Sequence, residues 1–350
     1  TRPNGPRLFG VGARRCRAML SRAATLRRAA FRPPAMLFST RPKKNRVSGR
    51  KKTSLDVQKL VLGSKSVSQT LSILIEHANV ADKANVAAAM HRMAKVAKPG
   101  FDGAAQRRAG DLRLERCATL ATSLIPTFFP RQLSQVCWGV VQLGGVDAAA
   151  DLLEKAAEPI TLKIEKFEPR ELASTLWAFA KAGVSAPALF QAAVLTVPKK
   201  LAEYDAPALT QTAWALSVSA PHLANPLFHS LAAEALSKMG SFKPAELADF
   251  ALAFAKAGVK HEALFEAVAV ESLKKLAAFK PQNLADVVWA FATAGVSAPK
   301  LFEAVAADAA IKASSFNDVN FKNVLWAYST AKITAPLLLA AAQGRAAAGA

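Results

Sequence analysis

The sequence has little cysteine and none of the local motifs that mark common enzyme sites. Cys16, Cys117 and Cys137 are far apart and form no C-x-x-C pair, so neither a disulfide framework nor a zinc ribbon is expected. No G-x-x-x-x-G-K-[ST], H-E-x-x-H or G-x-S-x-G motif is present. The histidines show no i, i+4 pairing with a third donor. We therefore expect no enzymatic activity, no cofactor and no metal site.

Long apolar runs and aromatic residues are also scarce. No stretch approaches the ~18 to 20 uncharged apolar residues that span a bilayer, so we expect no membrane insertion. Aromatic residues make up 7% of the chain, although hydrophobic residues make up 52%. This composition, in which alanine is prominent, predicts a helix-rich protein with small residues at its helix contacts.

Acidic residues are absent from residues 1–55, which carry 16 lysines and arginines. Apolar residues alternate with arginines between Cys16 and Phe31, as in an amphipathic helix. This composition predicts a transit peptide, and 12 arginines against four serines favour a mitochondrion over a plastid. The alternative is a disordered basic tail that contacts RNA or only solvates the terminus.

One phrase recurs along the rest of the chain. Two clear copies are FEPRELASTLWAFAKAGVSAPALF from Phe167 and FKPQNLADVVWAFATAGVSAPKLF from Phe279. Six copies begin at aromatic residues spaced 37 to 39 positions apart: Phe128, Phe167, Tyr204, Phe242, Phe279 and Phe316. A regular period of this length is typical of solenoid proteins.

Each copy predicts two helices, with positions counted from its aromatic residue. Proline at +2 suits the first turn of a helix, and glycine at +16 suits its end. Positions +5, +9 and +12 are apolar or small, as on a buried helical face. Since two such helices cannot bury their apolar faces alone, we predict an all-α fold, an α-solenoid of ~38-residue helix-turn-helix repeats. Residues 56–125 would form a degenerate N-terminal helical repeat, and residues 126–350 the array.

Position +10 adds a large ring to most copies. It holds Trp138, Trp177, Trp214, Trp289 and Trp326, with Leu252 as the exception. Large rings at a fixed helical offset usually pack, so we interpret these as wedges between helix pairs rather than as stacking surfaces for bases.

The pattern F-x-P-x-x-L-A-x-x-x-W-A-F-A-x-A-G-V-x-A-P-x-L-F resembles the octotricopeptide-type repeats of algal and protist organelle proteins, many of which end in a RAP domain. Residues 85–96, NVAAAMHRMAKV, resemble the degenerate first repeat of these proteins. Related animal proteins carry FAST-kinase-like regions. No RAP segment is recognisable in this sequence. The resemblance implies an organellar RNA-binding protein that acts in RNA stability, processing, splicing, translation or ribosome assembly. Its partners would be single-stranded RNA, either a transcript or rRNA, and ribosomal or processing proteins.

Two further positions carry hydrogen-bonding side chains that packing does not require. Position +7 holds Gln135, Ser174, Gln211, Asp249, Asp286 and Asn323. Position +4 holds Gln132, Glu171, Glu246, Asn283 and Asn320, with Ala208 as the exception. Position +11 holds only glycine or alanine on the same face, which we expect to leave room for a flat group. Helical-repeat RNA readers address one base with two or three side chains per repeat, so these residues are predicted to select bases along about six nucleotides.

Charge is the main argument against RNA. Residues 126–350 carry 20 basic and 19 acidic residues, so binding would depend on locally placed cations such as Lys181 and Lys256 at +14. A solvated helix face remains the alternative for positions +4 and +7. A protein-binding scaffold without RNA contact is the alternative function.

The leader gives a direct test. Residues 1–55 fused to a fluorescent reporter should carry it into an organelle, because import machinery recognises Arg-rich, acid-free amphipathic segments. Microscopy that finds the reporter in the cytosol would refute the targeting prediction.

Overall fold

The computed structural model describes residues 52–97, 112–144, 148–221 and 225–348, all within one compact unit, Ser48–Ala350. The predicted transit peptide lies almost entirely outside the described residues. The described part contains sixteen α-helices joined by short 3₁₀ turns and loops, and no strand. The prediction of an all-α solenoid is therefore confirmed.

The helices form successive pairs. The first helices of the pairs are α4 (Lys83–Val96), α7 (Pro130–Leu143), α9 (Pro169–Ala182), α11 (Ala206–Ser219), α13 (Pro244–Lys256), α15 (Pro281–Ala294) and α17 (Asp318–Ala331). The second helices are α6 (Arg113–Leu124), α8 (Ala148–Lys163), α10 (Pro187–Thr196), α12 (Asn225–Lys238), α14 (Glu262–Lys275), α16 (Pro299–Ile311) and α18 (Pro336–Ala348). Two further helices, α2 (Ser54–Gly63) and α3 (Val67–Glu76), pack on α4.

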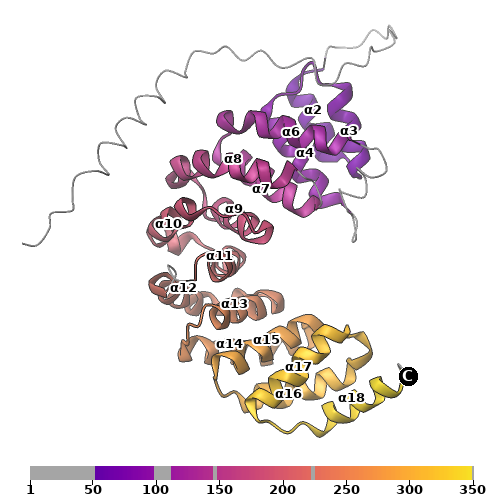
Figure 1. Cartoon of the computed structure of the whole chain (residues 1–350), viewed down its shortest axis with the longest axis vertical. Coiled ribbons are helices and arrows are strands. Elements are labelled where there is room, and N and C mark those ends of the chain that lie inside the picture. The colour runs from indigo at the N-terminus through magenta and orange to yellow at the C-terminus, as the bar shows by residue number, and fades with distance from the viewer. Residues whose placement is uncertain (1–51, 98–111, 145–147, 222–224, 349–350) are drawn as a thin grey trace, which may run out of the picture. The chain divides into compact units, whose positions relative to one another are not determined.

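Consecutive first helices lie side by side in chain order and make the closest packing in the molecule (Figure 1). Second helices form another layer, in which α6 packs on α8, and α12, α14, α16 and α18 pack in sequence. Residues at a given repeat position on the first helices therefore fall on the same face of the layer that the first helices form.

Local sequence sets where the first helices begin and end. Proline occupies the first turn of α7, α9, α13 and α15, as predicted, where its missing N–H is not needed. Gly183 and Gly295 end α9 and α15 with positive φ, a left-handed conformation that a Cβ disfavours. Lys332 takes the same conformation after α17, where the copy lacks glycine.

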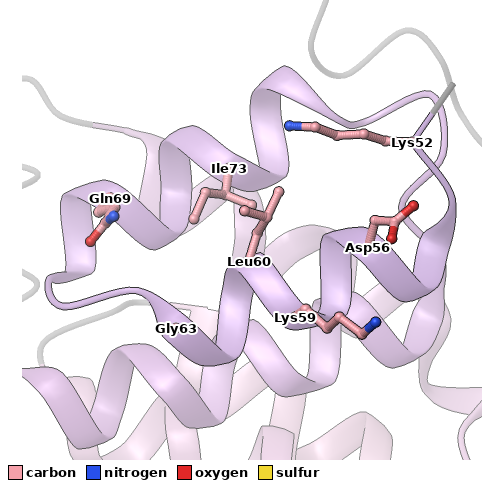
Figure 2. Close-up of a pocket in the computed structure, with 7 residues that line it drawn as sticks. All are labelled: Lys52, Asp56, Lys59, Leu60, Gly63, Gln69 and Ile73. Carbon is pink, nitrogen blue, oxygen red and sulfur yellow. The ribbon is translucent and has the colours of Figure 1, made fainter. Parts of the chain in front are cut away.

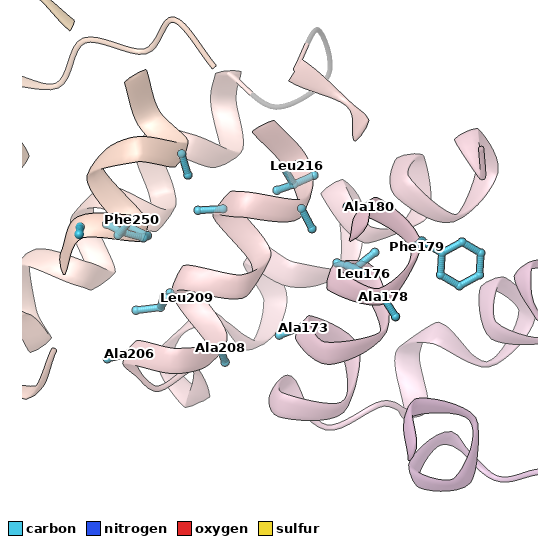
Figure 3. Close-up of a cluster of buried hydrophobic side chains, with 14 of the residues drawn as sticks. Ala173, Leu176, Ala178, Phe179, Ala180, Ala206, Ala208, Leu209, Leu216 and Phe250 are labelled. Carbon is cyan, nitrogen blue, oxygen red and sulfur yellow. The ribbon is translucent and has the colours of Figure 1, made fainter. Parts of the chain in front are cut away.

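The core contains the predicted apolar stripe of each first helix. Residues at +5, +9 and +12, such as Leu284, Val288 and Phe291, are buried, except for Leu325 at +9 of the last copy, which is partly buried. Figure 3 shows the cluster where α9, α11 and α13 meet, with alanines between the helices and Leu209, Leu216 and Phe250 beside them.

Position +11 corrects one expectation. The five alanines at +11 have 0% exposure, and Gly139 is also buried. Position +11 therefore leaves no room for a ligand. At Gly139 an added Cβ would lie 2.8 Å from the backbone carbonyl carbon and oxygen of Met90 in α4. Small residues at +11 are therefore needed because adjacent first helices approach backbone to backbone.

A lysine or arginine near the end of each copy donates a hydrogen bond to the carbonyl oxygen of the aromatic residue that begins that copy. Lys200 Nζ donates to the carbonyl oxygens of Glu165 at 2.9 Å and Phe167 at 3.1 Å. The same bond to the first aromatic residue's carbonyl is made by Lys163, Lys238, Lys275, Lys312 and Arg345. We call these six residues the junction cations. Each junction cation donates to a carbonyl oxygen at the 3₁₀ turn that precedes its own copy. It therefore links the turn at the start of the copy to the end of the same copy.

In the part of the chain that the structure describes, no helix has the length and apolar composition needed to cross a bilayer.

Substitution at Gly139 tests the close approach of the first helices. Gly139→Ala should lower the free energy of unfolding by about 1–3 kcal/mol, because the new methyl must push α7 away from α4. Gly240→Ala is the matched control, since no heavy atom lies within 4 Å of its added Cβ. Urea denaturation measures both, and equal stability of the two variants would contradict the packing.

Candidate functional site

The +7 side chains line the accessible face of the first-helix layer. All six are only partly buried, whereas the +11 residues beneath them are buried. Ser174 Oγ lies 3.3 Å from Gln211 Oε1, so neighbouring +7 side chains come into contact across helices. Asp249 acts electrostatically on Asp286, the +7 residue of the next helix. The structure thus brings the predicted +7 residues together as one row.

Position +4 has a different role in three copies. Gln132 accepts a hydrogen bond from the backbone N–H of Phe129, and Glu171 and Glu246 accept one from the residue three positions earlier, at 2.8 to 3.2 Å. These contacts are the returning half of an N-terminal capping box. The expectation that these three side chains are free to read a base is corrected, because helix capping already explains them. Asn283 and Asn320 lie partly buried at the same position.

Two carboxylates dominate the electrostatics of the +7 row. Burial and, to a smaller extent, the neighbouring charge of Asp249 raise the pKa of Asp286 to about 6, against the opposing effects of Lys256 and a hydrogen bond with Gln282. Burial also raises the pKa of Asp249, opposed by Lys256. Asp249 of α13 and Asp286 of α15 are therefore two partly buried carboxylates on neighbouring first helices, and Lys256 offsets only part of the cost of their charges.

Cations border the row at a few points. Lys181 and Lys256 are exposed in the last turns of α9 and α13, as predicted for +14. Arg131, exposed at +3 of α7, was not singled out from the sequence. Burial raises the pKa of Glu171, and the charge of Arg131 opposes that rise. Burial, together with the charges of Lys95 and Arg131, lowers the pKa of His91, so Arg131 lies near the row. Arg170 is paired with Asp205. The junction cations, six of the 20 basic residues in 126–350, bind backbone carbonyls.

The tryptophans at +10 lie beside the +7 row. Trp177, Trp214 and Trp289 also pack against the core, and the rings touch across consecutive first helices, as expected of wedges between helix pairs. Trp138, Trp177, Trp214 and Trp289 are half-buried, and Trp326 is 45% exposed. The sequence predicted packing because large rings recur at a fixed helical offset. The signal that places them beside the +7 row is helical spacing, since +3, +7, +10 and +14 share one face.

His91 of α4 extends this aromatic series toward the N-terminus. Its ring lies 5.0 Å from that of Trp138, and its Nδ1 is buried without a hydrogen-bond partner. Burial, with the charges of Lys95 and Arg131, lowers the pKa of His91 to about 4, so the ring is neutral near pH 7.

Other candidate sites are less developed. An open depression between α2 and α3 is lined by Lys52, Asp56, Lys59, Leu60, Gly63, Gln69 and Ile73 (Figure 2). It is built once and has no counterpart in the repeat pattern. Within the described ranges, no group of three or more His, Cys, Asp or Glu residues could hold a metal ion.

Comparison with known proteins finds one partial similarity. Residues 215–347 match a family model described as RNA-editing substrate-binding complex 6 protein. The match covers less than half of the chain and runs from within α11 to α18, so it includes Asp249, Asp286 and Asn323. No curated protein matches the chain.

The raised pKa of Asp286 predicts a pH-dependent stability. A carboxyl whose pKa rises from 3.8 to about 6 on folding favours the folded state when protonated, and this contribution is lost as pH rises through about 6. Asp286→Asn should therefore raise the free energy of unfolding at pH 7.5 by roughly 1–3 kcal/mol. The gain should shrink toward pH 4.

Thermal unfolding at several pH values measures this effect. Glu303→Gln, at an exposed position of α16, is the matched control and should change little. A gain for Asp286→Asn that is equal at pH 4 and pH 7.5 would rule out the proposed electrostatic cause.

Proposed function

We propose that this chain is an organellar RNA-binding protein that holds single-stranded RNA along the face of its first helices. The observation that carries the proposal is the +7 row, in which the first helices of six successive copies present partly accessible hydrogen-bonding side chains on one face. The match of residues 215–347 to a family named for an RNA-editing substrate-binding complex supports it. The Arg-rich, acid-free leader supports a mitochondrial location, with a plastid as the alternative.

The chemistry of the row suits base edges. Ionised Asp249 and Asp286 only accept hydrogen bonds, which fits the amino groups of cytosine, adenine or guanine. Gln135, Gln211 and Asn323 carry both a donor and an acceptor, so they can pair with any base edge. Lys181 and Lys256 would contact phosphates beside these positions. The protein would act by occupancy, protecting a transcript or positioning processing or ribosomal proteins, and without chemistry of its own.

A protein-binding scaffold is the second candidate, and exposed apolar side chains on the second-helix layer favour it. Leu162, Leu195 and Ile311 are 71%, 70% and 82% exposed on α8, α10 and α16. Such side chains suit a protein partner better than an RNA. The two functions can coexist, since the helices that carry these residues are not those that carry the +7 row.

RNA binding by the full chain tests the proposal. The protein should bind single-stranded RNA in preference to duplex, and log affinity should fall with log salt by about 0.7 per phosphate contact. Because the array is nearly neutral in charge, the slope should correspond to only a few contacts. Fluorescence anisotropy with a labelled pool of short RNAs measures both quantities.

Exchange of two row residues tests the base-reading role. The double variant Asp286→Asn, Asn323→Asp should change which bases are preferred at two neighbouring positions by roughly fivefold or more, because one bidentate contact discriminates by about 1–3 kcal/mol. Glu266→Gln, exposed on α14, is the control. An unchanged preference in a randomised-RNA selection would reject the assignment of the row, and no RNA binding at all would favour the scaffold.

A further inference from the structure

The tryptophans at +10 form a second row beside the +7 row. Ring centroids of Trp177 and Trp214 lie 6.2 Å apart, and those of Trp289 and Trp326 lie 5.8 Å apart with their planes 29° from parallel. Each pair bridges two consecutive first helices, α9 to α11 and α15 to α17. We call these residues, with Trp138, the tryptophan row.

Core packing accounts for only part of each ring, because Trp177, Trp214 and Trp289 pack against the core but are not fully buried. The residues at +5, +9 and +12 supply the buried face of each first helix. The fourth copy still forms both of its helices, α13 and α14, although Leu252 occupies +10 there. Trp326 is 45% exposed, so it leaves more apolar surface in contact with water than a smaller side chain would at this position. Partly accessible aromatic rings that recur on neighbouring first helices, with Trp326 the most exposed, point to contact with something outside the chain.

The neighbours of the tryptophan row indicate what that contact is. Each ring lies three residues after a hydrogen-bonding +7 side chain on the same helical face, as in Asp286 with Trp289 and Asn323 with Trp326. A flat group resting on the ring would therefore have its edge beside a hydrogen-bonding side chain. Nucleobases combine a π-face with a polar edge in this way.

We propose that the tryptophan row is a stacking platform on which bases of the bound single strand rest, one ring for each of five copies. This inference depends on the proposed RNA-binding function and names the interaction that supplies its affinity. Stacking compensates for the near-neutral charge of the array, because it is sequence-tolerant and needs no phosphate neutralisation. Leu252 leaves one position of the platform without a ring.

The ring spacing decides how the bases lie. A base inserted between two rings needs two stacking gaps of about 3.4 Å, or about 7 Å in total. The observed 5.8 and 6.2 Å are shorter than this sum. Bases therefore rest on the solvent-facing surfaces of the rings and do not intercalate between them.

Variants of the full chain test the platform in both directions. Trp326→Ala should weaken binding of a labelled single-stranded RNA about five- to a hundredfold, and Trp326→Phe should keep most of the affinity. Leu252→Trp should tighten binding by filling the gap in the row. Leu195→Ala, an exposed apolar residue on α10, is the matched control and should leave affinity unchanged.

An abasic RNA separates stacking from any structural effect. It keeps its phosphates but offers no base, so Trp326→Ala should bind it as well as the unmodified protein does. If the unmodified protein binds RNA but Trp326→Ala and Leu252→Trp do not change the affinity, the platform is refuted and the RNA-binding function stands. If Trp326→Ala loses affinity equally for abasic RNA, the ring is structural and the platform is also refuted. If the unmodified protein binds no RNA, both proposals fail.

Discussion

The close approach of consecutive first helices is the constraint on which the rest of the structure depends. Glycine or alanine at +11 brings their backbones together, and at Gly139 even one methyl group would collide with the Met90 carbonyl. With this side of each helix buried, helical geometry places +7 and +10 at the accessible surface of every copy. The regular row of polar and aromatic side chains is therefore a consequence of how small the packing residues are.

The same packing determines where charge can act. Junction cations such as Lys200 and Lys275 bind backbone carbonyls at the start of their copies, so they serve the array rather than a ligand. Arg131, Lys181 and Lys256 are among the cations that border the accessible row. An RNA held by this face would depend on base contacts more than on phosphates, which agrees with the partly accessible tryptophans.

Much of the fold could be predicted from the sequence, because one period repeats six times with proline, apolar and glycine positions in register. The same regularity identified the +7 row. It could not separate +4 from +7, because glutamate at +4 serves equally as a cap or as a surface acceptor. It predicted that the tryptophans pack between helix pairs, but it did not show that each ring also keeps an accessible surface beside the +7 row. The junction cations were missed because their partners are backbone atoms some 33 residues away, as for Lys275 and Phe242.

The most direct test of the account is to map where RNA touches the protein. Ultraviolet crosslinking of the full chain to single-stranded RNA, followed by mass spectrometry of the attached peptides, locates each contact. The account requires crosslinked nucleotides on the first helices, concentrated on peptides of α7, α9, α11, α15 and α17 that carry a tryptophan. Crosslinks confined to the second helices, or to residues 1–51, would contradict it.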